Sequence, residues 1–525
     1  MNNRPSNYKP SAFKPGITIN KEKSISRIVS TALAAMLPIT AYAQEKAATS
    51  AATVPSTPVQ PATNAPSAGL VNDWLREQSS MFSPWDIGGQ FRARLEVKDF
   101  IDTPGQAGQV AFRHEHGDAN NTYLLLRQKL HVGYNDNWFT TYIEGQESSS
   151  TGDKRNPNLE SDQFDLHQGY VTLGNLNEFP VLAKVGRQEL SYGDERLIGA
   201  FDWNNIGRSF DAAKLRYVVT AGSWVDAFTS YVVVPRDNHF DFPNNYDAFS
   251  GVYASSRDLI PWQETQLYFL VRNVSHNSPN LETGALVPLA SPRDIYTPGF
   301  RVKSLPGKLH GFDYGLEAAY QFGRFEPVTG VAPTAVTGRN LKQEAYMVHA
   351  EGGYAWATSW FPRVGLEFNY ASGDKNPNDD THGTFDTLFP TTHAIVGILD
   401  LYSLQNIEDL RINFGLKPTK KFTVFSSFRG VWLATPADSF YLANQSPRTG
   451  GTPGGHNGYA LNPTYDRFVG TEADLVLTYN FTSYAQVQGG YSHFFVGNYV
   501  KQSLSAPGFG STDANYLYLQ TTFRF

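Results

Sequence analysis

The sequence predicts an all-β protein: a single transmembrane antiparallel β-barrel of about 18 strands, which follows a signal peptide and a disordered linker. Three observations predict this fold. Long segments alternate apolar with polar residues at a period of two, aromatic residues cluster where these segments end, and the chain finishes on such a segment with Phe525.

The alternation is clearest in WDIGGQFRARLEVK (85–98), where apolar residues and one glycine take the odd positions, and polar residues and one glycine the even positions. The pattern returns in 123–134, 312–322, 363–370 and 410–417. A period of two is typical of a strand with one apolar face. A soluble sandwich gives the same pattern, but most of these segments run about ten residues or more, as a tilted membrane strand requires, whereas soluble strands run nearer about five or six.

Aromatic residues at segment ends, as in Trp138-Phe139, Trp360-Phe361 and Phe494-Phe495, fit the girdles of a membrane barrel. The last segment, NYLYLQTTFRF, ends on Phe525 and resembles the C-terminal signal of outer-membrane barrels. The sequence contains no apolar stretch of about 18 residues that would form a transmembrane helix. The residues after position 84, at about 24 per strand and connection, give about 18 strands, within the even range of single-chain bacterial barrels.

The N-terminus predicts export. Residues 1–43 combine a basic region, an apolar run from 28 to 38 and the small-x-small cleavage site Ala41-Tyr42-Ala43, which together indicate a signal peptide. Residues 44–84 are a linker rich in Ala, Pro and Thr, which cannot form a core, with a short helix expected in LVNDWLREQSSMF. The barrel then occupies 85–525.

The composition excludes several function classes. The chain has no cysteine, so disulfides, thiolate metal sites and a cysteine nucleophile are excluded. Its net charge of −6 argues against a nucleic-acid partner. The loop GDKNPNDD (373–380) lacks the glycine and glutamate of a calcium loop, and HEH (114–116) fits an exposed loop tip, so we expect neither a metal nor another cofactor.

Charges of both signs crowd into residues 185–219. We expect the ends of this stretch to cross the membrane as strands and its middle, 191–210, to fold near or into the lumen. A charge facing lipid near mid-bilayer costs about 2–4 kcal/mol, so charged residues in strands should face the lumen. The predicted pore-lining residues are Arg92, Arg94, Arg127, Lys129, Arg187, Glu189, Lys214, Arg216, Arg272, Glu317, Arg363, Glu367, Arg411, Arg429, Glu472 and Asp474.

These basic residues have two interpretations. Arginine holds carboxylates with a planar fork of donors, which suits contact with an anionic solute. The same arginines can instead pair with lumen carboxylates and only support the wall. We expect both, with the acids concentrated in loops and the arginines at lumen-facing strand positions, which favours anions.

Four segments together resemble the alginate-export family of outer-membrane porins. They are GRQELSYGDERLIGAFDWNNIGRSFDA (186–212), YASGDKNPNDDTHGTFDTLFPTTH (370–393), FRGVWLA (428–434) and VGTEADLVLTYNF (469–481). With the final strand, the resemblance covers about residues 85 to 525, and it implies a monomeric 18-stranded barrel with a narrow, charged pore. Characterised members export an anionic polyuronate, whereas the Ala/Pro/Thr-rich linker is not part of the family pattern and hints at a different periplasmic partner.

The resemblance implies a passive porin or channel in the bacterial outer membrane for anionic or carbohydrate solutes. It leaves open whether the chain exports an anionic polysaccharide such as alginate or passes another solute. A carbohydrate-active enzyme is the alternative class; because no nucleophile signature such as G-x-S-x-G is present, we expect no enzyme. The expected partners are membrane lipid, the solute, the barrel-assembly machinery through Phe525, and periplasmic export proteins.

Overall fold

A computed structural model of the chain describes residues 69–101, 112, 120–155, 160–236, 239–275, 291–329, 336–445, 447–448, 459, 461–505 and 510–525. Of the two compact units of the chain, Met1–Ser50 and Ala51–Phe525, these residues belong to the second. The predicted signal peptide and most of the predicted linker lie outside the described residues.

Eighteen long strands form one sheet. They are β1 (Trp85–Asp99), β2 (Asn121–Asn135), β3 (Phe139–Thr151), β4 (Asp162–Leu173), β5 (Val181–Gln188), β6 (Phe210–Thr220), β7 (Ser223–Val234), β8 (Phe242–Ile260), β9 (Gln263–Val274), β10 (Arg293–Ser304), β11 (Phe312–Phe325), β14 (Leu341–Ala355), β15 (Arg363–Ala371), β17 (Ile407–Leu416), β18 (Phe422–Leu433), β21 (Phe468–Asn480), β22 (Ala485–Val496) and β23 (Ala514–Arg524). Short elements lie outside or between them: α2 (Leu70–Gln78), η2 (Ser80–Phe82), β12 (Val328–Thr329), β13 (Val336–Thr337), β16 (Thr381–His382), α3 (His393–Val396), β19 (Phe440–Tyr441), β20 (Pro447–Arg448) and α4 (Asn498–Ser505).

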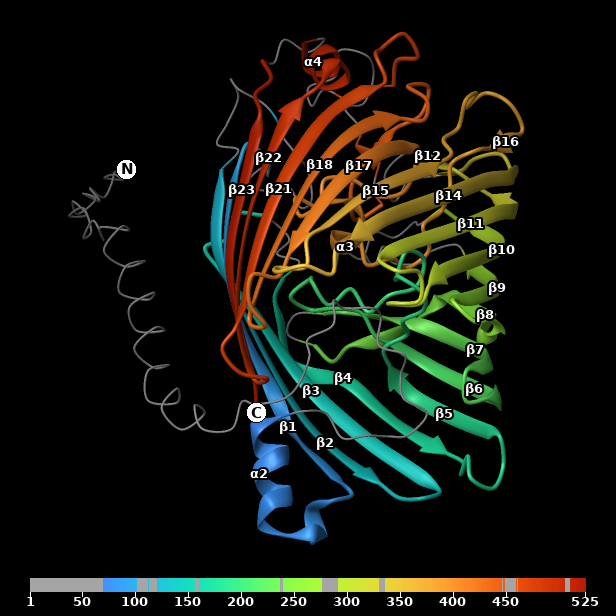
Figure 1. The fold of residues 1–525 in the computed structure, drawn as a ribbon. Coiled ribbons are helices and arrows are strands. Elements are labelled where there is room, and N and C mark those ends of the chain that lie inside the picture. Colours follow the sequence, from blue (N-terminus) through green and yellow to red (C-terminus); the bar gives the residue numbers. More distant parts are fainter. Residues whose placement is uncertain are drawn as a thin grey trace, which may run out of the picture. The chain divides into compact units, whose positions relative to one another are not determined.

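The sheet closes on itself. Each long strand pairs antiparallel with the next, and β23 pairs antiparallel with β1, so the blue and red strands of Figure 1 are neighbours. The last residue completes this seam, because Phe525 N donates to Gly89 O (3.0 Å) and Gly89 N donates to Phe525 O (2.9 Å). Closure leaves no unpaired edge in the bilayer. The predicted antiparallel barrel of 18 strands is confirmed.

Apolar side chains face outward and polar ones inward, as the period-two pattern predicts. In β2, Leu130 and Val132 are about half exposed, whereas Arg127 is 1 % exposed and Lys129 8 %. A soluble β-protein has the opposite distribution, with its apolar side chains most deeply buried. The outer face therefore suits lipid, and the inner face suits polar contents.

The connections differ between the two ends of the barrel. At one end they span two to seven residues, and at the other seven to 35; we call these the turn end and the loop end. Both the first strand and the last meet the turn end, where the predicted lead-in helix, α2, is fixed by a hydrogen bond from Asn72 Nδ2 to Asp86 Oδ1 (2.6 Å). Among the described residues, no helix is both long and apolar enough to span a membrane.

Candidate functional site

Two loop-end connections cross the space that the strands enclose (Figure 1). The first inner segment, residues 189–209, joins β5 to β6, and the second inner segment, residues 372–406, joins β15 to β17. Both are rich in buried residues, although loops normally lie on the surface. The prediction that the middle of 185–219 folds into the lumen is confirmed by the contacts described below.

The two inner segments bind each other. Ile198 and Phe389 form a parallel bridge, Gly199 N donates to Phe389 O (2.8 Å), and Thr391 N donates to Glu195 O (2.9 Å). Position 199 requires glycine, because a Cβ there would overlap Thr391 Oγ1. The segments therefore form one unit across the lumen rather than two independent loops.

Arginines from β1 and β2 hold the first inner segment. Arg92 donates to the carbonyl oxygens of Asp202 (2.6 Å) and Asn204 (3.0 Å), and Arg94 donates to that of Trp203 (2.8 Å). Arg127 donates to the same Asp202 carbonyl (3.0 Å) and forms an ion pair with the Asp202 carboxylate (2.8 Å). Charged donors make stronger hydrogen bonds than neutral ones. These three predicted pore-lining residues are thus anchors of the segment.

Asn205 completes this anchor, although it was not among the predicted pore-lining residues. Its side chain is fully buried, and its Nδ2 donates to the carbonyls of Leu126 (3.0 Å), Ser149 (3.2 Å) and Glu160 (3.0 Å). An amide can hold several carbonyls at once without introducing a charge. Only the folded position of the segment brings these carbonyls together, so spacing along the chain could not indicate them.

Arginines from β9 and β18 hold the second inner segment. Arg272 of β9 donates to Asp386 Oδ1 (3.1 Å) and to the carbonyl of Leu388 (3.3 Å), and Arg429 of β18 donates to the carbonyl of Ile395 (2.8 Å). Arg429 is fully buried. The predicted lumen position of both arginines agrees with these contacts.

An apolar cluster also lies inside the barrel, where the period-two prediction placed polar side chains. Phe389 of the second inner segment packs against Phe210 (ring centroids 5.3 Å apart) and Phe249 (4.9 Å), which point inward from β6 and β8. The inner segments supply the apolar surface that these inward phenylalanines need. The lumen at the loop end is therefore partly a packed core.

Most other predicted residues form pairs along the inner wall. Arg216 binds Asp226 through two hydrogen bonds (2.6 and 2.8 Å), and Arg363 binds Asp313 (2.6 Å). The remaining pairs are Lys214 with Asp226, Glu317 with Arg196, Arg411 with Glu367, Glu472 with the backbone N–H of Leu399, and Asp474 with Ser427. These contacts match the supporting role that was predicted for the charged residues of the wall.

Arg187 does not share the inner face. It has the same parity in β5 as Val185, which is 55 % exposed, and it pairs with Asp211 (2.8 Å) on the outer face of β6. Both residues lie next to the loop end, where an outward charge can reach water. Its assignment to the pore lining is corrected accordingly.

Carboxylates are also more frequent on the inner wall than expected. Asp86, Glu96 and Asp247, besides the acids paired above, lie inward within the strands rather than in loops. The expected separation of acids into loops and arginines into strands therefore does not hold. A buried arginine requires a nearby acceptor, which explains why acids accompany the arginines.

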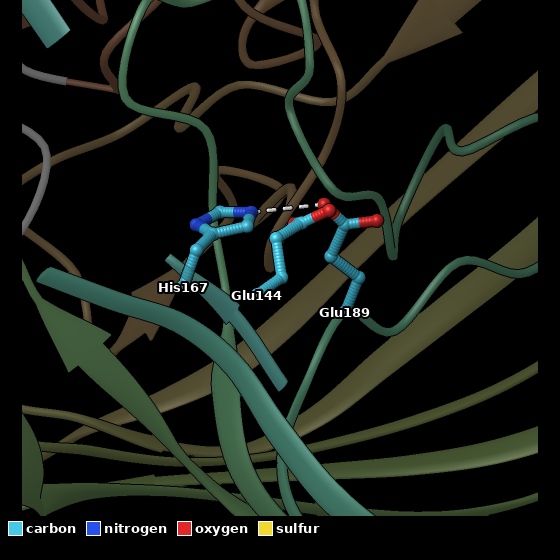
Figure 2. Close-up of side chains that lie close together, drawn as sticks. All are labelled: Glu144, His167 and Glu189. Carbon is cyan, nitrogen blue, oxygen red and sulfur yellow. Dashed lines mark hydrogen bonds and ion pairs between the residues drawn. The ribbon is translucent and has the colours of Figure 1, made fainter. Parts of the chain in front are cut away.

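A small acidic cluster joins the inner wall to the start of the first inner segment (Figure 2). Glu144, His167 and Glu189 bring one ligand atom each within 4.8 Å of the others, and His167 Nε2 lies 2.9 Å from Glu189 Oε1. The Lys129 ammonium lies 3.5 Å from both carboxylates, so a cation already sits between them. Burial raises the pKa of Glu189, but Lys129 and His167 outweigh burial and lower it to about 2.

The other metal candidates from the sequence do not form a ligand set among the described residues. In 373–380, Asp374 Oδ1 accepts from Asn376 N (3.1 Å), and Asp374 N donates to Asp438 Oδ2 (2.9 Å). These hydrogen bonds stabilise the turn of the loop and attach it to Asp438. His114 and His116 lie outside the described residues.

The lumen keeps space for water beside the first inner segment. The Asp202 side chain is 63 % exposed, although it lies inside the barrel and Arg92, Arg94 and Arg127 bind the backbone carbonyls of Asp202 and its neighbours. The surrounding protein partly desolvates the Asp202 carboxylate, but the charges of Arg127 and Lys129 outweigh this effect and hold its pKa below its usual range. An ionised, solvent-facing carboxylate thus marks the water-filled part of the passage.

One inward cation, Lys184, was missing from the predicted pore-lining residues. Lys184 faces inward from β5 and lies opposite Lys214 of β6, which was predicted. The period-two pattern could have indicated its inward position, because Lys184 alternates with the apolar Ala183 and Val185.

Comparisons with known proteins agree on the family and the fold. The family model described as "Alginate export" matches residues 84–507. Among solved structures, Pseudomonas aeruginosa OpdO (11 % identity, 84 % of this chain and 97 % of that chain, TM-score 0.51) and OccK9, also called OpdG (10 %, 84 % and 98 %, TM-score 0.51), are similar in fold. No curated protein matches the chain.

Proposed function

Because the chain belongs to the alginate-export family, we propose that it is a passive channel of the bacterial outer membrane that lets anionic carbohydrates pass. The observation that carries this proposal is the arrangement of the lumen: two anchored inner segments narrow a charged barrel, and the side chain of Asp202 in the first segment stays exposed to water. Barrels of this size leave an aqueous channel unless loops fill them.

The charges of the wall support weak, repeated contact with a charged solute. Conduction requires binding that is favourable enough for entry and weak enough for exit. Arginines that already hold acids, such as Arg363 with Asp313 and Arg216 with Asp226, leave only part of their donors to a solute. Anionic polysaccharide export and passage of a smaller anionic sugar both fit this wall.

The reversal potential of single channels in a KCl gradient tests the proposal. We expect conductance with a preference for chloride. A cation preference would contradict the anionic solute. Absence of conductance, both in the wild type and in a variant lacking residues 373–392, would contradict the channel itself. Fractionation that recovers the protein outside the outer membrane would contradict its proposed location.

We also propose that the chain has no catalytic activity on its solute. Support comes from the polar clusters of the inner wall, in which acids such as Glu144 and Glu189 are already occupied by Lys129 and His167. Incubation of the folded barrel with alginate, followed by an assay for new reducing ends and unsaturated uronate, checks this. Product formation above that of heat-unfolded protein would contradict the proposal.

A further inference from the structure

One group of inward cations is not explained by anchoring. Lys184 and Lys214 lie directly opposite each other on β5 and β6. Like charges in this position destabilise a sheet. Asp226 lies 3.9 Å from Lys214 and already receives two hydrogen bonds from Arg216. Lys214 and Arg216 thus share one carboxylate, and Lys184 makes no ion pair with it.

Lys184 has fewer polar contacts than Lys214 or Arg216. Among the described strand residues, Lys184 and the rim residue Arg524 are the inward cations whose side chains make neither an ion pair nor a hydrogen bond. Its ammonium lies 3.5 Å from the ring centroid of Tyr170. A cation over an aromatic face is attracted only weakly while water is near, by about 0.5–1 kcal/mol. This contact leaves the donors of the ammonium free for an anion.

Tyr170 adds a second free donor. Its side chain is partly exposed on the inner face of β4, and its hydroxyl has no hydrogen-bond partner among the described residues. Tyr142 stacks against it (ring centroids 5.3 Å apart), which fixes the ring beside Lys184. On the other side of the lysine pair, the Lys214 ammonium lies 5.8 Å from the ring centroid of Tyr192. Aromatic rings therefore flank the lysines on both sides.

We propose that Lys184, Lys214 and the Tyr170 hydroxyl form a binding station for the carboxylate of a sugar acid on the inner wall. This inference rests on the proposed function and names the place where the anionic sugar is held. A carboxylate between the two ammonium groups removes their repulsion and accepts charge-assisted hydrogen bonds. The apolar C–H face of the sugar ring would lie against the flanking aromatic rings.

Block of chloride current by sodium D-glucuronate tests the station, with glucose as the neutral probe and acetate as the acid without a ring. We expect Lys184→Gln to raise the blocking constant for glucuronate about tenfold or more, since hydrogen bonds to charged groups are lost, and Tyr170→Phe to raise it about threefold. Lys342→Gln, which removes the same charge from the outer face of β14, is the matched control and should change nothing. If alginate oligomers block the current more tightly than glucuronate does, the occupant is a segment of the polymer. If both block equally, the occupant is a single sugar acid. Both results support the station.

If Lys184 stabilised the barrel instead of binding a solute, Lys184→Gln would lower the unfolding temperature. We expect this temperature to stay unchanged or to rise, because the substitution removes one of two opposed lysines. Loss of glucuronate block without loss of stability therefore supports the station. Unchanged block in Lys184→Gln overturns it, even where the wild type prefers anions. If the wild type does not conduct, the proposed function fails, but saturation-transfer NMR of glucuronate with the detergent-folded barrel still tests the station. A glucuronate signal that is present with the wild type and lost with Lys184→Gln supports the station. Absence of the signal with the wild type overturns it.

Discussion

Replacing Arg92 by methionine should release the first inner segment and widen the channel. Methionine keeps much of the side-chain volume and removes every donor. Arg92 donates to the carbonyls of Asp202 (2.6 Å), Asn204 (3.0 Å) and Trp203 (3.3 Å) and to Asn205 Oδ1 (3.3 Å). The backbone ladder of the barrel does not include any of these bonds, so the effect should be local.

The magnitude follows from the two shortest bonds. Each hydrogen bond to a charged group contributes about 1.5–3 kcal/mol. The released carbonyls face a lumen that holds water, so we take the lower value and expect docking of the segment to weaken by about 3 kcal/mol. The ratio of docked to undocked segment then falls by about a hundredfold. A second variant, Arg92→Met with Arg127→Met, also removes the ion pair to Asp202 and should exceed the single change.

Single-channel recording measures this effect directly. We expect longer or more frequent visits to a larger conductance, and faster protease cleavage within 189–209. Arg324→Met is the control, because Arg324 is an exposed outer-face residue paired with Asp294. The reasoning is refuted if the Arg92 variant folds, as judged by heat-dependent gel mobility, and shows the conductance distribution of the wild type.

Three further outcomes follow from buried groups and from the seam. Burial and the charge of Arg293 lower the pKa of His382 to about 4, against about 6.5 in an unfolded chain, so the second inner segment should lose up to about 3 kcal/mol of docking as pH falls from 6.5 towards 4. Channel noise should therefore rise on acidification in the wild type but not in His382→Gln; equal rises would exclude this histidine. Asp226→Asn leaves Arg216 without its fully buried carboxylate, and the free energy of unfolding should fall by about 3–5 kcal/mol; an unchanged unfolding temperature would contradict this. Deleting Phe525 should lower the yield of inserted barrel, and yields equal to the wild type would speak against recognition of this residue by the assembly machinery.

The sequence could predict the barrel because its strands repeat one physical rule many times. In β2, lipid outside and a polar lumen inside force Leu130 and Lys129 to opposite faces, and the residue order alone records that choice. The same rule would have placed Arg187 correctly, since it shares the parity of Val185. Near the loop end the rule weakens, because an outward charge there can pair with Asp211 and reach water.

The inner segments were harder to predict, because their contacts join residues far apart in the chain. Arg92 meets Asp202 across 110 positions, and Arg272 meets Asp386 across 114. No periodicity records such contacts. The charges of 185–219 did indicate a segment inside the lumen, but not which arginines would hold it. Nor could they indicate the inward Phe210 and Phe249, whose faces are explained only by Phe389.

These contacts change how the charge of the lumen should be understood. An 18-stranded barrel is too wide to select a solute by its wall alone, so loops must narrow it, and loops inside a barrel need fixed acceptors and donors. Arg92, Arg127 and Arg429 meet that need through backbone carbonyls. Counting arginines therefore overstates the charge available to a solute. The informative cations are those that do not hold the inner segments. By that criterion Lys184, which lies opposite Lys214 and has neither an ion pair nor a hydrogen bond among the described residues, is a better candidate for solute contact than the arginines that hold these segments.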